Sequence, residues 1–245
     1  VNLLKPDFVL TGGDLIMDAL GKTQEGADSL YQLYINLQKK FNMPVYNTPG
    51  NHEHFAFYKK EEIQRTHPDY GDKMFRRYLG KPYYSFNHKG WHFIVLNSVM
   101  ETEARGYRGG VSPDQIEWLR KDLHGVDSET PIIVSVHIPL ISGHTQIKSG
   151  ALAVPNIGSV VNNSKEVLTL FEEKNLKLVL QGHLHYLEDL YMGGKTHFIT
   201  GGAVSAKWWT GPIDGIQEGF LKISVQGDEF SWEYIDYEWE AVEKD

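Results

Sequence analysis

The sequence contains no cysteine, and this absence excludes both disulfide bonds and metal sites built on thiolate ligands. It also has no apolar run approaching the roughly 18 residues that predict a membrane-spanning helix. Basic residues are in the minority, because 24 lysines and arginines stand against 32 aspartates and glutamates and give a formal net charge of −8. That balance disfavours general attraction to a phosphate backbone, although it leaves room for a local basic patch.

The length and composition are typical of one globular domain. The chain has 245 residues, of which 41% are hydrophobic and 23% charged, so it can bury a sizeable core. We therefore expect a single domain over residues 1–245. Val1 stands where an initiator Met would be, no signal peptide is visible, and a buried-type strand begins almost at once. We expect an N-terminally truncated or processed chain, and both a cytoplasmic and a secreted or periplasmic location stay open.

Apolar runs and turn residues alternate along the chain in a pattern that indicates a mixed α/β sandwich. Continuous apolar runs predict buried strands, and apolar residues at helical spacing predict the helices between them. Strands are expected over 7–11, 44–48, 131–136 and 176–180, helices over 27–41, 72–79, from 112 and over 163–174, a hairpin over 83–86 and 91–96, a long loop over 139–162, and several antiparallel strands within 186–239.

Short polar motifs follow the predicted strands, in a fixed order. Because the carboxyl ends of strands form the ligand-binding crevice of α/β folds, we expect these side chains to meet at one edge. Aspartate, asparagine and histidine are oxygen and nitrogen ligands for divalent metals, so the set predicts a metal centre. The motifs are Gly13-Asp14, Gly50-Asn51-His52-Glu53, His137 and Gly182-His183-Leu184-His185.

Ligand chemistry suggests how these residues divide. The Asp14 carboxylate can bridge two metals, since it has two oxygens with several lone pairs, whereas Asn51 offers a neutral amide oxygen. His137 and His183 would complete the set around one ion. A turn after Gly182 could aim His185 at a second ion about 3.5–4 Å from the first. Each signal alone is weak, but the ordered set is much more specific.

These motifs resemble those of the calcineurin-like metallophosphoesterases, the superfamily that includes purple acid phosphatases and class III cyclic nucleotide phosphodiesterases. The resemblance implies an α/β four-layer sandwich of two mixed β-sheets flanked by helices. It also implies a centre of two divalent or trivalent ions (Fe, Mn or Zn), with Asp14 as the bridge. Asn51, His137 and His183 would hold one ion and His185 the other. A metal-bound hydroxide would then attack phosphorus in a phosphomonoester or phosphodiester, while His52 protonates the leaving oxygen.

One element of the family pattern is missing, because no Asp-x-His motif precedes Asp14. We therefore expect the first strand to be absent, with two ions in the intact protein and one in this chain. A non-catalytic metal- or phosphate-binding module, or an inactive fragment, is the alternative function. A nuclease is a second alternative that the acidic balance disfavours. The leading hypothesis remains a metal-dependent hydrolase of a small phosphate ester.

Other residues have weaker claims. His144, in the long loop, could touch a substrate phosphate, but a solvated loop histidine is the preferred interpretation. Trp208 and Trp209 could form an apolar wall for a leaving group or equally pack as core. Glu53 is expected to brace its turn rather than bind metal, and Arg108 could lie near a phosphate.

Overall fold

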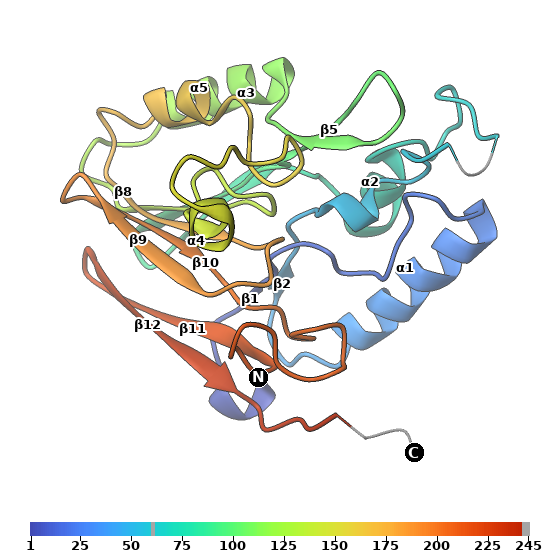
Figure 1. Cartoon of the computed structure of the whole chain (residues 1–245). Helices are drawn as coiled ribbons and strands as arrows, with labels where there is room; N and C mark the ends of the chain where they lie inside the picture. The colour runs from blue at the N-terminus through green and yellow to red at the C-terminus, as the bar shows by residue number, and fades with distance from the viewer. Residues whose placement is uncertain (60–61, 242–245) are drawn as a thin grey trace.

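The computed structural model describes residues 1–59 and 62–241, and helices surround a central sheet (Figure 1). The elements, with η marking a 3-10 helix, are η1 (Asn2–Leu4), β1 (Val9–Leu10), α1 (Gln24–Gln38), β2 (Val45–Tyr46), η2 (Asn51–Glu53), α2 (Lys73–Leu79), β3 (Tyr84–His88), β4 (Trp91–Val95), β5 (Val99–Glu101), β6 (Tyr107–Gly109), α3 (Pro113–His124), β7 (Ile132–Ser135), α4 (His144–Ser149), α5 (Ser164–Thr169), β8 (Leu176–Gln181), β9 (Glu188–Met192), β10 (Thr196–Thr200), β11 (Gly219–Gln226) and β12 (Glu229–Asp236).

Six strands form the main sheet in the order β3-β4-β7-β8-β10-β9. The four inner strands are parallel to one another, and β3 and β9 run antiparallel at the two edges. Every residue of β4 and β7 is buried, and a parallel strand covered on both faces appears in the sequence as a nearly continuous apolar run. The predicted hairpin over 83–86 and 91–96 is confirmed as β3 and β4.

Alternate residues of the inner strands belong to two different cores, because successive side chains point to opposite faces. Ile132 and Val134 of β7 share a core with residues of α3 and α5. Ile133 belongs to the second core, where Leu221 and Ile223 of β11 pack against it. Figure 1 accordingly places α3 and α5 on one side of the main sheet and the β11-β12 hairpin on the other.

A second strand layer lies on the hairpin side of the main sheet. It consists of the parallel pair β1-β2 and the antiparallel pair β11-β12. Phe8, next to β1, packs edge-on against Phe86 and Phe93 of the main sheet. Helix α1 also contacts the β1-β2 pair, since Tyr34 of α1 donates a hydrogen bond to Asn47, which follows β2. The α/β class and the layered arrangement are therefore confirmed, with the second strand layer divided into two separate pairs in the part of the chain described.

Three predicted segments differ in detail. Helix α1 starts earlier than expected because Thr23 caps it by accepting a hydrogen bond from the Gly26 N–H. The predicted loop over 139–162 contains α4, a short helix with no buried residue and therefore no apolar periodicity to detect. The prediction of antiparallel strands within 186–239 is confirmed by the β9-β10 and β11-β12 pairs, but β10 also pairs in parallel with β8, which the sequence did not indicate. No helix within the described ranges combines the length and apolar character needed to cross a membrane.

Candidate metal centre

The connections after β1, β2, β7 and β8 bring four of the expected ligands together. Asp14 follows β1, Asn51 opens η2 after β2, His137 follows β7 and His183 follows β8. The His137 ring donates from Nδ1 to the Gly12 carbonyl at 2.7 Å, which ties the main sheet to the end of β1. The site is therefore built across both strand layers.

The Nε2 atom of His137 lies at the centre of this group. It is 3.0 Å from Asp14 Oδ2, 3.1 Å from Asn51 Oδ1 and 3.2 Å from His183 Nδ1. Since the Gly12 carbonyl can only accept, Nδ1 of His137 carries a proton, so Nε2 is the nitrogen that presents a lone pair when the ring is neutral, as a metal ligand must be. A histidine metal ligand is commonly oriented in this way by a backbone carbonyl on its other nitrogen.

This set of atoms fits a metal ion. Oxygen and nitrogen atoms with lone pairs converge from four side chains, and the ligand atoms of Asp14, His137 and His183 all lie within 4.8 Å of one another. Asn51 and His137 are each only 2% exposed, so water cannot easily screen the mutual repulsion of these lone pairs. A cation at their centre removes that repulsion, and the mixed carboxylate, amide and imidazole set suits a borderline divalent metal.

The protonation equilibria also reflect the need for positive charge. Burial alone would raise the pKa of Asp14, but the imidazoles of His137 and His52 outweigh it and hold that pKa well below the usual range. Burial and the neighbouring His137 lower the pKa of His183 to about 3, so its ring is neutral near pH 7. For His137, burial lowers the pKa, but the Asp14 carboxylate and its hydrogen bond raise it overall.

Two glycines allow the backbone to come this close. Gly13 has a φ of +89°, and a Cβ there would lie 2.4 Å from the His137 Nδ1 atom. At Gly50, a Cβ would lie 2.2 Å from Asp14 Oδ1 and 2.3 Å from the Asp14 backbone nitrogen. Asp14 itself adopts a left-handed φ of +53°, a conformation that persists only where the surroundings enforce it.

Glu53 supplies much of that enforcement. Its fully buried carboxylate accepts hydrogen bonds from the backbone N–H groups of Asp14, Leu15, Ile16 and Gly50, at distances of 2.6–3.0 Å. The prediction that Glu53 braces its turn is therefore confirmed. Burial, followed by the Asp14 charge, raises the pKa of Glu53, and the backbone N–H groups oppose that shift.

A family model for calcineurin-like phosphoesterases matches residues 1–187, which include all of these ligands. The chain belongs to the calcineurin-like phosphoesterase family. Among curated relatives, it is 27% identical over 180 residues to a 3′,5′-cyclic-nucleotide phosphodiesterase of Nostoc sp., covering 73% of this chain and 56% of that protein. It is also 23% identical to a probable glycerophosphodiester phosphodiesterase of Arcobacter nitrofigilis, covering 68% of this chain and 55% of that protein. The chain thus spans about half the length of the curated relatives it matches.

Solved structures of two relatives support the fold of this phosphoesterase-family chain. A dimetal phosphatase from Danio rerio superposes with a TM-score of 0.55 at 16% identity, covering 82% of this chain and 74% of that one. A purple acid phosphatase from yellow lupin superposes with a TM-score of 0.60 at 16% identity, covering 96% of this chain and 45% of that one. The family resemblance seen in the motifs is confirmed by the family model.

His52 lies at the open side of the candidate metal centre. Its backbone N–H donates to Asp14 Oδ1 at 3.1 Å, and its Nε2 is 3.8 Å from Asp14 Oδ2. The ring is one-third exposed, in contrast to the buried Asn51 and His137. Asp18 lies on its other side, with a carboxylate oxygen 3.8 Å from Nδ1. The imidazole therefore faces both the candidate centre and solvent.

His185 does not join the cluster of Asp14, His137 and His183. Both His183 and His185 have left-handed φ angles, of 70° and 48°, so a turn and not an extended strand separates them. The His185 ring donates from Nδ1 to the Ala206 carbonyl at 2.8 Å and leaves Nε2 free to bind another group. Its assignment to a second ion stays a prediction.

The three residues predicted to contact the substrate, Trp208, Trp209 and His144, have different neighbours in the structure. The Trp208 ring lies 5.0 Å from the His185 ring, whereas the Trp209 ring packs edge-on against Trp239. Both tryptophans are more than half exposed, at 58% and 51%, so the alternative that they pack as core was wrong. His144 opens α4, and its ring packs against that of Tyr186 at 5.0 Å.

Two residues near the site, Tyr107 and Asn97, were not predicted from the sequence as functional residues. Tyr107, next to the suggested Arg108, approaches the His183 ring edge-on at 6.1 Å, and burial raises its pKa to about 12. Asn97 donates to Nε2 of the buried His54, whose Nδ1 in turn bonds to the Gly50 carbonyl. The signal for Asn97 was its place directly after the apolar run of β4, as for the ligands themselves.

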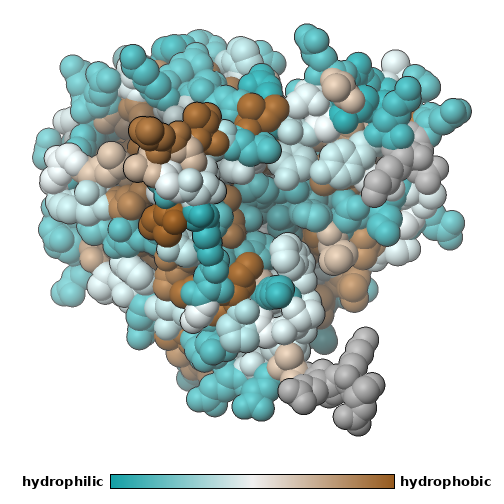
Figure 2. All heavy atoms as spheres, viewed as in Figure 1, coloured by the Kyte–Doolittle hydropathy of each residue, from teal (hydrophilic) through white to brown (hydrophobic). Residues whose placement is uncertain are grey.

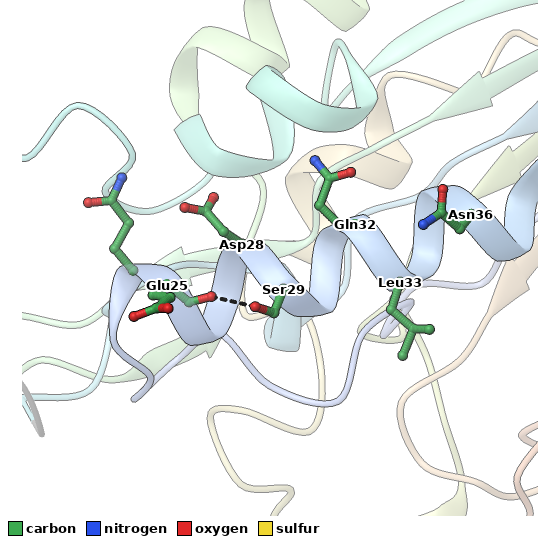
Figure 3. Close-up of a pocket in the computed structure, with 7 residues that line it drawn as sticks. Glu25, Asp28, Ser29, Gln32, Leu33 and Asn36 are labelled. Atoms are coloured by element: carbon green, nitrogen blue, oxygen red, sulfur yellow. Dashed lines mark hydrogen bonds between the residues drawn. The ribbon is translucent and has the colours of Figure 1, made fainter.

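A separate hollow lies on the surface of α1 (Figure 3). Its residues are far in sequence from His137 and His183, the candidate ligands that follow β7 and β8. Glu25, Ser29, Leu33 and Asn36 are among the residues that line it. Asp28 also lines this hollow, and its carboxylate forms an ion pair with Arg77. None of the metal-centre residues lines this hollow, so it is not part of the candidate site.

Proposed function

We propose that this chain is a metal-dependent hydrolase of small phosphate esters. The observation that carries the proposal is the convergence of Asp14, Asn51, His137 and His183 on one point, with the one-third exposed His52 beside them. Membership of the calcineurin-like phosphoesterase family supports the same reaction class.

Asp14, Asn51, His137 and His183 would hold one metal ion, and His185 would contribute to a second. When bound, such ions lower the pKa of water and neutralise charge that builds on phosphoryl oxygens. The protein residues contribute geometry. The Gly12 carbonyl fixes the His137 tautomer, and the carboxylate of Glu53 fixes the backbone on which Asp14 lies. Preorganised ligands of this kind need little rearrangement when substrate binds.

His52 is the residue that would donate a proton to the leaving oxygen. Its ring is open to solvent on one side and lies next to the Asp14 carboxylate on the other. The Asp14 and Asp18 carboxylates flank the ring, and each lies 3.8 Å from one of its nitrogens. Imidazole is the side chain most often used for general acid catalysis, and this position lets it reach both the candidate centre and solvent.

The proposed substrate class rests on the net charge of the chain, which favours a small ester over a long polyanion, and on the names of its curated relatives. The net charge of −8 disfavours long polyanions, so a nucleic acid is a poorer candidate than a small ester. Two curated relatives carry names of phosphodiesterases, which makes a phosphodiester the first substrate to test here.

The test compares hydrolysis of p-nitrophenyl phosphate and bis(p-nitrophenyl) phosphate by the purified chain with Mn²⁺, Zn²⁺ or iron. Because catalytic metals contribute several kcal/mol, Asp14→Asn should lower kcat by about 100-fold or more. Glu117→Gln, an exposed carboxylate on α3, is the matched control and should retain full activity. A wild-type rate no higher than that of Asp14→Asn contradicts the proposal. Tight metal binding without turnover would instead identify a non-catalytic module.

A further inference from the structure

The segment between β10 and β11 carries an exposed tryptophan against His185, the residue predicted to hold a second ion. The Trp208 ring packs against the ring of His185, with the ring centroids 5.0 Å apart and the ring planes tilted by 38°. The residue is nevertheless 58% exposed, which leaves a large part of the ring open. A large, open aromatic surface beside a candidate ligand requires an explanation, because exposing tryptophan forfeits the gain from burying it.

The segment that presents this ring is held firmly. His185 donates to the Ala206 carbonyl, Tyr237 donates to the Val204 carbonyl, and Lys148 of α4 forms an ion pair with Asp214. Ala206 is completely buried, unlike the tryptophans that follow it. Trp208 is therefore displayed from a braced loop, and a preset ring loses little conformational entropy when a ligand binds.

The backbone supports the same conclusion. Ala206, Trp208 and Trp209 all have left-handed φ angles, of 38°, 50° and 64°. Non-glycine residues in this region cost about 1–2 kcal/mol each, so such conformations persist where the surroundings over-determine them. Strain of this kind concentrates at binding sites, and here it turns Trp208 toward His185.

Helix α4 lies against the segment that carries Trp208, because Lys148 of α4 pairs with Asp214 of that segment. Ile147, next to Lys148, is apolar and 67% exposed. Figure 2 shows brown, apolar atoms on the face of the molecule that carries α4 in Figure 1. The flat, exposed indole of Trp208 suits a planar aromatic group, because aromatic rings stack on one another.

We propose that the exposed part of the Trp208 ring is a stacking platform for a planar aromatic group of the phosphoester substrate, while its phosphate lies at the candidate metal centre. This inference rests on the proposed function. Trp209 is not part of the platform, since its ring packs against Trp239 and not against a histidine of the site. The substrate class narrows accordingly to aryl or heteroaromatic phosphate esters.

The experiment uses phenylphosphonate and cyclohexylphosphonate, which carry the same anionic head and six-carbon rings but differ in planarity. Neither is hydrolysed, so calorimetric titration of the Mn²⁺-loaded chain reports binding alone. Aromatic stacking beyond simple burial is worth about 0.5–1.5 kcal/mol, so phenylphosphonate should bind about 2- to 12-fold more tightly. Trp208→Leu should reduce this preference to about one, and Trp208→Phe should keep part of it.

Trp209→Leu is the matched control, because it removes an equally exposed neighbouring indole. It should leave the preference for phenylphosphonate unchanged. The proposal is overturned if wild type binds both compounds equally, if the preference survives in Trp208→Leu, or if Trp209→Leu abolishes it as well. When both phosphonates bind equally, only the platform fails; when neither binds, the proposed function fails with it. Trp208→Phe decides the matter if Trp208→Leu does not fold.

Discussion

Glu53 is the residue whose replacement tests the architecture of the candidate centre most directly. Oε1 of its carboxylate accepts from the N–H groups of Leu15 and Ile16, and Oε2 accepts from those of Asp14 and Gly50. In Glu53→Gln one oxygen becomes an amide NH2 group. Whichever way the amide turns, two backbone donors then face another donor instead of an acceptor.

The magnitude follows from these bonds. A hydrogen bond to a charged group contributes roughly 1.5–3 kcal/mol, so losing two should lower the free energy of unfolding by about 3–6 kcal/mol. That is a large share of the roughly 5–15 kcal/mol typical of a folded domain. Because Asp14 and Gly50 lose their anchor, metal affinity should also fall by about 10- to 100-fold, as for other residues that orient ligands.

Two assays check this prediction. Urea unfolding of the metal-free chain gives the change in stability, and titration with Mn²⁺ gives the change in affinity. Glu117→Gln, at an exposed position on α3, is the control and should change stability by no more than about 0.5 kcal/mol. If Glu53→Gln stays within 1 kcal/mol of wild type and binds Mn²⁺ as tightly, the buried carboxylate does not brace the ligands and our reasoning is refuted.

Three further predictions concern the same centre. His52→Gln should lower kcat by about 100- to 10,000-fold with unchanged metal content, and loss of metal would make His52 a ligand instead. Gly50→Ala should cost about 1–3 kcal/mol because its Cβ would meet Asp14, whereas Gly12→Ala, with nothing within 4 Å of its Cβ, should be nearly neutral in thermal unfolding. Chelation should lower the melting temperature, and Mn²⁺ at 100 times its Kd should restore about 2.7 kcal/mol; a melting curve indifferent to metal would show that the four ligands bind none.

The grouping of the candidate ligands could be predicted because their signals are local. Asp14, Asn51 and His183 each follow an apolar run and a sharp turn, and His137 directly follows an apolar run, so the rule that strand ends meet at one edge was enough to group them. The brace by Glu53 was also foreseeable, since a carboxylate directly after a ligand turn can reach backbone donors. Local sequence patterns identify such residues because strand, turn and ligand occupy fewer than ten positions each.

What could not be predicted depends on tertiary contacts. The His185–Ala206 hydrogen bond joins residues from two loops, and the position of Trp208 depends on it. Helix α4 lacks a buried face, so the sequence carries no periodicity to reveal it. Strand propensity does not determine which strands pair with each other, so the position of β10 between β8 and β9 could not be predicted either.

The division of the second strand layer gives the metal centre a structural role as well. Asp14 and Asn51 follow the short β1-β2 pair, whose strands have two residues each, while His137 and His183 follow the main sheet. Few backbone hydrogen bonds hold so short a pair, so the contacts at the site carry much of its attachment. Those contacts place lone pairs against lone pairs around Nε2 of His137. A cation there converts this repulsion into attraction between the two layers, so metal binding and stability of the β1-β2 pair should be coupled.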